Sequence, residues 1–128
     1  MLLCHCCIMA RILVIDDEQS VRAALEQTLR SAGHTVILAA DGLEGITEHC
    51  RKAADLVITD IYMPGQDGVE TMIHFRELAP EVPIIAISGN PTAEKFAVVE
   101  NLGALALVEK PFDVRQLLEL IENVLKRA

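Results

Sequence analysis

The chain contains 128 residues, of which 52% are hydrophobic, and it carries a formal net charge of −8. This length is enough for one domain with a hydrophobic core of its own. The acidic charge argues against a nucleic-acid-binding surface, and no apolar run is long enough to cross a bilayer. We therefore expect a cytoplasmic domain that contacts neither nucleic acid nor membrane directly.

The first eight residues hold three of the four cysteines, Cys4, Cys6 and Cys7, next to His5. A zinc site is one interpretation, but zinc ligands usually come from pairs about two to four residues apart, and adjacent ligands close a tetrahedron poorly. We favour the alternative that residues 1–8 are an N-terminal appendage, either disordered or left over from cloning. Residues 9–128 then form a single domain.

Apolar segments of strand length alternate with segments of helical periodicity along the chain. The predicted strands are Ile12–Ile15, Thr35–Ala39, Leu56–Thr59, Ile84–Ile87 and Leu105–Val108. They lack a regular alternation of polar and apolar residues, which is typical of strands buried on both faces. The pattern therefore predicts an α/β fold, a doubly wound five-stranded parallel sheet with helices on both faces.

Capping residues mark the ends of the predicted helices. The first helix carries apolar residues from Val21 onward and stops at Gly33, because glycine is favoured just beyond a helix. Asp41 is expected to cap the second helix, with Glu44 as its capping-box partner. The third begins near Asp67-Gly68, the fourth follows Asn90-Pro91, and the fifth begins at Asp113.

Charged or hydroxyl side chains follow four of the five predicted strands. Asp16 and Asp17 follow the first strand, Asp60 the third, Ser88 the fourth and Lys110 the fifth. The carboxyl ends of parallel strands meet at one edge of the sheet, where the ligands of such folds bind. We expect these side chains to converge there. The second strand ends in alanines, which fits a position at the side of the sheet.

Three carboxylates in one place repel each other and resist burial, so a positive charge is expected among them. Oxygen ligands favour Mg²⁺, and an ammonium and a hydroxyl beside a metal ion suit a phosphoryl group. A carboxylate in that setting can act as a nucleophile and form an acyl phosphate. Asp60 is the best candidate, because it stands alone on the central strand while Asp16 and Asp17 can hold the metal.

Four motifs taken together resemble the receiver domains of bacterial response regulators. They are the acid pair in VIDDE, the acceptor segment DLVITDIYMPGQDG, the hydroxyl in IAISG and the lysine in VEKPF. The resemblance extends from Arg11 to Arg127. It implies a flavodoxin-like sheet of strand order 2-1-3-4-5 and a switch of two-component signalling rather than a turnover enzyme.

The resemblance also assigns roles to individual residues. It implies that a sensor histidine kinase or a histidine phosphotransfer protein phosphorylates Asp60. It further implies that Mg²⁺ is held by Asp16, Asp17, Asp60 and the backbone carbonyl of Tyr62. Lys110 would pair with the phosphoryl group, Ser88 would turn toward it, and the Lys110-Pro111 bond would be cis. The position three residues before the lysine, often aromatic in the family, is Leu107 here.

Other functions remain open at this point. A Mg²⁺-dependent phosphatase or phosphotransferase would need a substrate pocket, for which the short loops leave little room. A flavodoxin-like binding module would need a phosphate-cradling loop, whereas the loop after the first strand is acidic. A receiver-like module could also signal by binding alone. The output would be a downstream protein or a missing C-terminal output domain. Glu18, Asp67 and the histidines are interpreted as structural.

Overall fold

The computed structural model describes residues 8–63, 66–90 and 92–127, and within them five strands form one parallel sheet. These strands are β1 (Arg11–Ile15), β2 (Thr35–Ala39), β3 (Leu56–Asp60), β6 (Ile84–Ser88) and β7 (Ala106–Glu109). Their spatial order is β2-β1-β3-β6-β7, which confirms the predicted order 2-1-3-4-5 and the edge position of the second strand. The last strand begins one residue later than predicted.

A small antiparallel pair, β4 (Tyr62–Met63) with β5 (Gln66–Asp67), follows β3. The sequence analysis did not predict it, because strands of two residues leave no periodic pattern. The pair lies directly after Asp60, so it belongs to the edge of the sheet where the candidate residues were expected.

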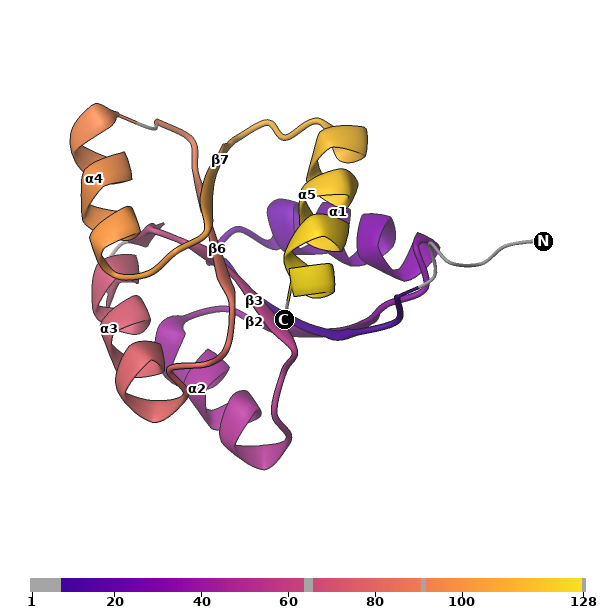
Figure 1. The fold of residues 1–128 in the computed structure, drawn as a ribbon, viewed down its shortest axis with the longest axis horizontal. Helices are drawn as coiled ribbons and strands as arrows, with labels where there is room; N and C mark the ends of the chain where they lie inside the picture. The colour runs from indigo at the N-terminus through magenta and orange to yellow at the C-terminus, as the bar shows by residue number, and fades with distance from the viewer. Residues whose placement is uncertain (1–7, 64–65, 91, 128) are drawn as a thin grey trace.

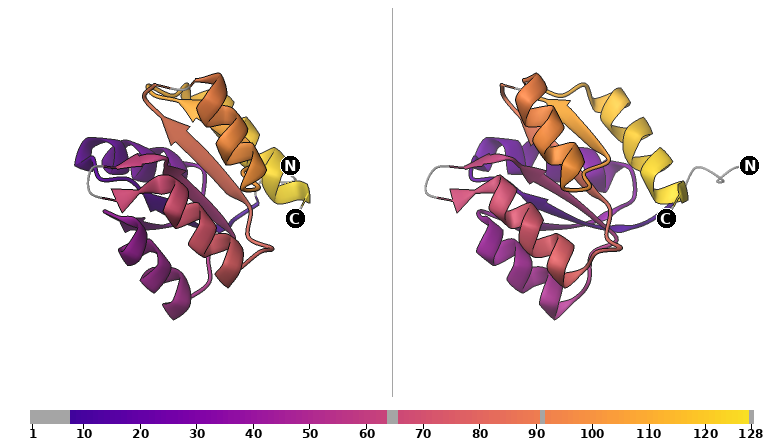
Figure 2. Two further views of the ribbon diagram at one scale, coloured as in Figure 1. Left: turned by 90° about the vertical axis from the view of Figure 1, so that its left-hand side faces the viewer. Right: turned by 60° about the vertical axis from the view of Figure 1, so that its left-hand side comes forward.

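Helices cover both faces of the sheet (Figures 1 and 2). They are α1 (Gln19–Ser31), α2 (Gly42–Arg51), α3 (Gly68–Leu78), α4 (Ala93–Asn101) and α5 (Val114–Arg127). Helices α1 and α5 pack on one face, and α2, α3 and α4 on the other. The doubly wound α/β architecture is therefore confirmed.

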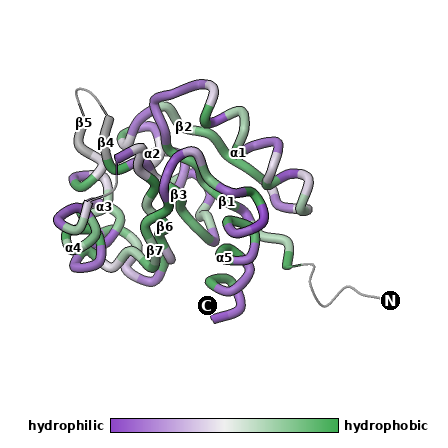
Figure 3. Tube along the Cα trace, turned by 90° about the horizontal axis from the view of Figure 1, so that it is seen from above, coloured by the Kyte–Doolittle hydropathy of each residue, from purple (hydrophilic) through white to green (hydrophobic). Residues whose placement is uncertain are grey.

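Alternate residues of each strand feed two separate cores. In β1, Ile12 and Val14 pack with Leu25 of α1 and Ile121 of α5. Leu13 and Ile15 point the other way and join the core that contains Met72 and Phe75 of α3. Along the tube of Figure 3, β3 and β6 are hydrophobic, whereas the helices alternate between hydrophobic and hydrophilic turns. Burial on both faces explains the apolar runs in the sequence.

Most predicted helix ends are confirmed. Gly33 has a positive φ of 95°, and the amides of Gly33 and His34 donate to carbonyls in the last turn of α1. Asp41 accepts the amide of Glu44 (2.8 Å), as predicted. The fourth helix differs: its cap is Thr92, which accepts the amide of Lys95, and not Asn90. The helix starts later than its Asn-Pro signal indicated.

The histidines that the structure describes in detail serve the fold, in line with their structural interpretation. The imidazole of His49 accepts the amide of Ala54 (3.0 Å) and meets the ring of Phe75 edge-on. His34 accepts the amide of Ala10 (3.2 Å). Among the described residues, no helix is both long and apolar enough to span a bilayer. The cysteines and histidine of residues 4–7 lie outside the described residues, so the appendage stays a prediction.

Gly68 begins α3 and lies against the backbone that carries Asp60. A Cβ atom at this position would lie 2.3 Å from the carbonyl oxygen of Asp60 and 2.4 Å from Cα of Ile61. Backbone atoms cannot move aside as a flexible side chain can. The absence of a side chain at Gly68 therefore lets α3 pack against the end of β3.

We predict that Gly68→Ala lowers the free energy of unfolding by about 1–3 kcal/mol, the usual cost of overpacking. Urea unfolding followed by circular dichroism measures the change. Gly89→Ala is the matched control, because a Cβ atom at Gly89 meets no atom within 4 Å; it should change stability by less than about 0.5 kcal/mol. Equal stability of both variants would contradict the packing argument.

Candidate functional site

The register of the sheet brings the predicted site residues to one edge. Ile15 pairs with Thr59, Asp60 with Ile87, and Ser88 with Glu109. The carboxyl ends of β1, β3, β6 and β7 therefore lie within a residue or so of one another. The residues at or just after these ends, Asp16, Asp17, Asp60, Ser88 and Lys110, come from segments far apart in the chain and meet at this edge.

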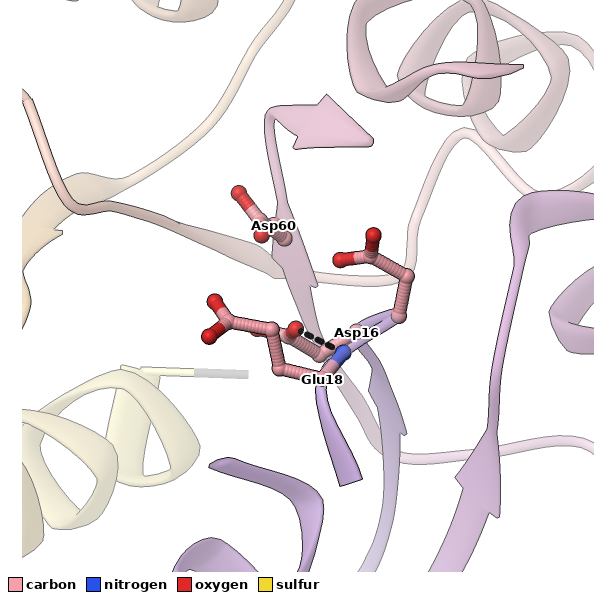
Figure 4. A group of neighbouring side chains, drawn as sticks. Asp16, Glu18 and Asp60 are labelled. Atoms are coloured by element: carbon pink, nitrogen blue, oxygen red, sulfur yellow. Dashed lines mark hydrogen bonds between the residues drawn. The ribbon is translucent and has the colours of Figure 1, made fainter. Parts of the chain in front are cut away.

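Four carboxylates cluster at the ends of β1 and β3. Each of Asp16, Asp17, Glu18 and Asp60 offers one oxygen, and these oxygens all lie within 4.8 Å of one another. Figure 4 shows Asp16, Glu18 and Asp60 around a common space, with the amide of Glu18 donating to Oδ1 of Asp16 (2.8 Å). Asp16 and Asp60 are buried, whereas Asp17 and Glu18 are exposed. Such a set of oxygen donors could hold a divalent cation.

Lys110 supplies a positive charge to this acidic cluster. Its Nζ lies 2.9 Å from Oδ2 of Asp16, 2.9 Å from Oδ2 of Asp60 and 3.1 Å from Oε1 of Glu18. Burial alone lowers the pKa of the Lys110 ammonium. The carboxylates of Asp16 and Asp60, which accept from this ammonium, outweigh the effect of burial and raise that pKa above its usual value. Lys110 therefore stays charged over the whole physiological range.

Burial disfavours the charged form of the Asp16 carboxylate. Its side chain is fully buried, and this burial raises the pKa of Asp16 in spite of the bonds to Lys110 and to the Glu18 amide. Oδ2 of Asp16 lies 2.9 Å from Nζ of Lys110, and Oδ1 accepts the amide of Glu18. A buried, negatively charged oxygen within a cluster of oxygen donors fits a cation site.

Ser88 and Lys110 are joined through their backbones. The amide of Lys110 donates to the carbonyl of Ser88 (2.8 Å), and the buried Ser88 hydroxyl accepts the amide of Asn90 (3.1 Å). Both residues line a cleft of about 210 Å³ together with Asp60 and Glu18. Lys95 of α4 also lines it. The lining of the cleft thus contains two carboxylates, a hydroxyl and two ammonium groups.

Two charged residues that line the cleft, Glu18 and Lys95, were not predicted as site residues. Glu18 was interpreted as a loop residue, yet it joins the acidic cluster and pairs with Lys110. Its place as the third acid in VIDDE was the available signal. Lys95 had no signal of its own, because its position depends on where α4 begins. Tyr62 lies in β4 directly after Asp60 and Ile61, and its role as a backbone ligand stays a prediction. The Lys110-Pro111 bond is cis, as the resemblance implied.

Comparison with known proteins now decides the family. The model of the response regulator receiver domain matches residues 12–122. The chain belongs to the response regulator receiver domain family. A curated relative, Response regulator MprA of Mycobacterium leprae, is 32% identical over 117 residues, which make up 91% of this chain and 51% of that protein. The chain spans about half the length of the curated relatives it matches.

Solved structures of receiver domains share the fold. The chemotaxis protein CheY4 of Vibrio cholerae is 31% identical, with a TM-score of 0.86 over 91% of this chain and 99% of that one. NtrX from Brucella abortus, solved in complex with ADP, is 30% identical with a TM-score of 0.89, but the match covers 28% of that chain. This receiver domain is thus similar both to single-domain proteins and to part of a longer regulator.

We predict that Asp16→Asn stabilises the receiver domain in the presence of a metal chelator by about 1 kcal/mol. The substitution removes a charge that burial disfavours, as its raised pKa indicates. A raised pKa in the folded state means that the folded protein gains a proton as the pH falls. The difference between wild type and variant should therefore shrink from neutral pH downward.

Urea unfolding at several pH values measures this difference. Asp41→Asn is the control, because Asn caps a helix as well as Asp does and Asp41 lies outside the acidic cluster. A less stable Asp16→Asn variant at neutral pH would mean that the ion pair with Lys110 outweighs the burial of Asp16.

Proposed function

We propose that the chain is a phosphorylatable switch of a two-component system, in which Asp60 accepts a phosphoryl group. The observation that carries the proposal is the position of Lys110 Nζ, 2.9 Å from Oδ2 of Asp60, in a cleft that also contains the Ser88 hydroxyl. An ammonium and a hydroxyl around a buried carboxylate suit a group that gains phosphoryl oxygens.

The transfer requires little covalent chemistry from the protein. An oxygen of the Asp60 carboxylate attacks the phosphorus of the donor, and a new P–O bond forms. The bond from phosphorus to the donor's nitrogen or oxygen breaks, and the leaving group departs with its electron pair. Lys110 keeps one contact to Asp60 and offers the rest of its hydrogen-bonding capacity to the arriving oxygens.

The residues of the acidic cluster fit Mg²⁺. The buried carboxylate of Asp16 and the neighbouring oxygens of Asp17 and Asp60 provide hard, negatively charged donors. The backbone carbonyl of Tyr62 is proposed as a further ligand. When bound, the ion would neutralise charge on the phosphoryl oxygens. Glu18 is close enough to assist, either directly or through water.

Phosphorylation would then shift a two-state equilibrium. The phosphoryl group adds negative charge and acceptor oxygens beside Ser88 and Lys110. Lys110 already contacts Asp60, whereas the Ser88 hydroxyl accepts the amide of Asn90 and would turn toward the phosphoryl group by a movement of the loop after β6. The backbone bond from Lys110 to Ser88 couples this loop to the one after β7. Such a movement favours one of two existing conformations over the other.

The proposed phosphoryl donor is a sensor histidine kinase or a histidine phosphotransfer protein, located with this domain in the cytoplasm. The proposed recipient of the signal is a downstream protein or an output domain such as the remainder of the longer relatives.

We predict that incubation with acetyl phosphate and Mg²⁺ adds one phosphoryl group to the wild-type chain and none to Asp60→Asn. Intact-mass spectrometry detects the adduct. Asp41→Asn is the matched control and should be modified like the wild type, because its carboxylate caps α2 away from the cleft. An unmodified wild-type chain would overturn the proposal and favour a receiver-like module that signals by binding alone.

We also predict that Mg²⁺ stabilises the folded chain by about 2.7 kcal/mol at one hundred times its Kd, because the ion binds only the folded cluster. Thermal and urea unfolding with and without Mg²⁺ measure the effect. Asp17→Asn should lose most of it, since Asp17 is an exposed ligand with little role in packing. Asp41→Asn should retain it. An equal response of all three proteins would place the ion elsewhere.

A further inference from the structure

Lys95 places a second ammonium group at the cleft. The residue lies in the first turn of α4, and its side chain lines the cleft that contains Asp60, Ser88 and Lys110. Its backbone position is defined by the cap, because Thr92 Oγ1 accepts the Lys95 amide (3.1 Å).

The ammonium of Lys95 is tied to the loop that carries Ser88. Nζ donates to the carbonyl oxygen of Asn90 at 2.8 Å, and the amide of Asn90 donates to Oγ of Ser88 at 3.1 Å. Asn90 is therefore held at two points: its amide by the Ser88 hydroxyl and its carbonyl by Lys95. Any change in what Lys95 contacts is transmitted to this loop.

The two lysines of the cleft differ in their partners. The ammonium of Lys110 already forms ion pairs with Asp16, Glu18 and Asp60. Within the described part of the chain, Lys95 has no salt bridge, and its recorded partner is a neutral carbonyl. A phosphoryl group on Asp60 would bring up to about two negative charges into the cleft. Lys95 is the cation better able to exchange its partner.

We propose that Lys95 is a second phosphoryl-binding residue. Its ammonium leaves the carbonyl of Asn90 and donates to an oxygen of the incoming phosphoryl group, which assists the transfer and draws the first turn of α4 toward Asp60. The exchange also frees the loop that holds Ser88. The inference rests on the proposed phosphorylation of Asp60 and names a further group that binds the phosphoryl oxygens.

The test compares the wild-type chain of 128 residues with Lys95→Met, Lys95→Arg and Lys126→Met. The second-order rate constant of phosphorylation by acetyl phosphate with Mg²⁺ is measured by intact mass at low and high ionic strength. Lys95→Met should react about fivefold more slowly at low ionic strength, the upper range for a partly exposed ion pair. Lys95→Arg should recover most of the rate, and the deficit of Lys95→Met should shrink in salt.

Lys126→Met controls for loss of one positive charge. Its ammonium pairs with Glu122 on the surface of α5 (3.0 Å), so its rate should equal that of the wild type. If the wild-type chain gains the adduct and Lys95→Met reacts at the same rate, the role proposed for Lys95 is overturned. The proposed phosphorylation of Asp60 is not affected by that result. Equal, salt-independent losses in Lys95→Met and Lys95→Arg would also overturn the role proposed for Lys95, because they indicate a structural role. No adduct on the wild type would overturn the proposed function together with this inference.

Discussion

The ion pairs of Lys110 are the interaction on which the rest of the site depends. One ammonium lies within 3.1 Å of three carboxylates, two of which are buried. Without it, Asp16 and Asp60 would face each other at the end of the sheet with their charges poorly compensated, which is costly in a low-dielectric setting. Lys110 thus compensates negative charge among carboxylates that are buried at the end of the sheet.

This dependence explains why the site lies across four adjacent strands. β1, β3 and β6 are paired in register, and β7 brings Lys110 in from the far side of β6. A slip of one residue in any pairing would send Asp60 or its neighbours to the other face of the sheet. The two hydrophobic cores prevent such a slip, because each takes every second residue of β1. The packing that stabilises the fold therefore also positions the carboxylates.

The residue pattern was sufficient for the fold class and for the convergence of Asp16, Asp17, Asp60, Ser88 and Lys110, whereas the strand order was implied by the resemblance to receiver domains. Strand ends carry this information, because apolar runs stop abruptly at charged residues and parallel strands share one carboxyl edge. The part that could not be predicted depends on loop conformation. Glu18 reaches Lys110 across a separation of 92 residues, and nothing local to Glu18 indicates that contact.

The start of α4 illustrates the same limit. Asn90-Pro91 and Thr92 are all acceptable residues at a helix start, and local preference does not choose between them. The structure uses Thr92 as the cap, and Lys95 lies in the turn that follows it, at the cleft. The contact of Lys95 with this cleft depends on how α4 packs on the sheet, which the local sequence does not show.

Leu107 gives the loop after β6 added importance. The resemblance to receiver domains includes a frequent aromatic residue at this position, whose rotamer reports the state of the switch. Leu107 instead pairs with Ala86 in the sheet register and packs at the margin of the core that contains Phe75. An aliphatic side chain held there has no ring to exchange between an inner and an outer position. Under the proposed function, we therefore expect a signal from Asp60 to rely on the hydrogen bonds that connect Lys110, Ser88 and Asn90, and this chain of contacts reaches α4 through Lys95.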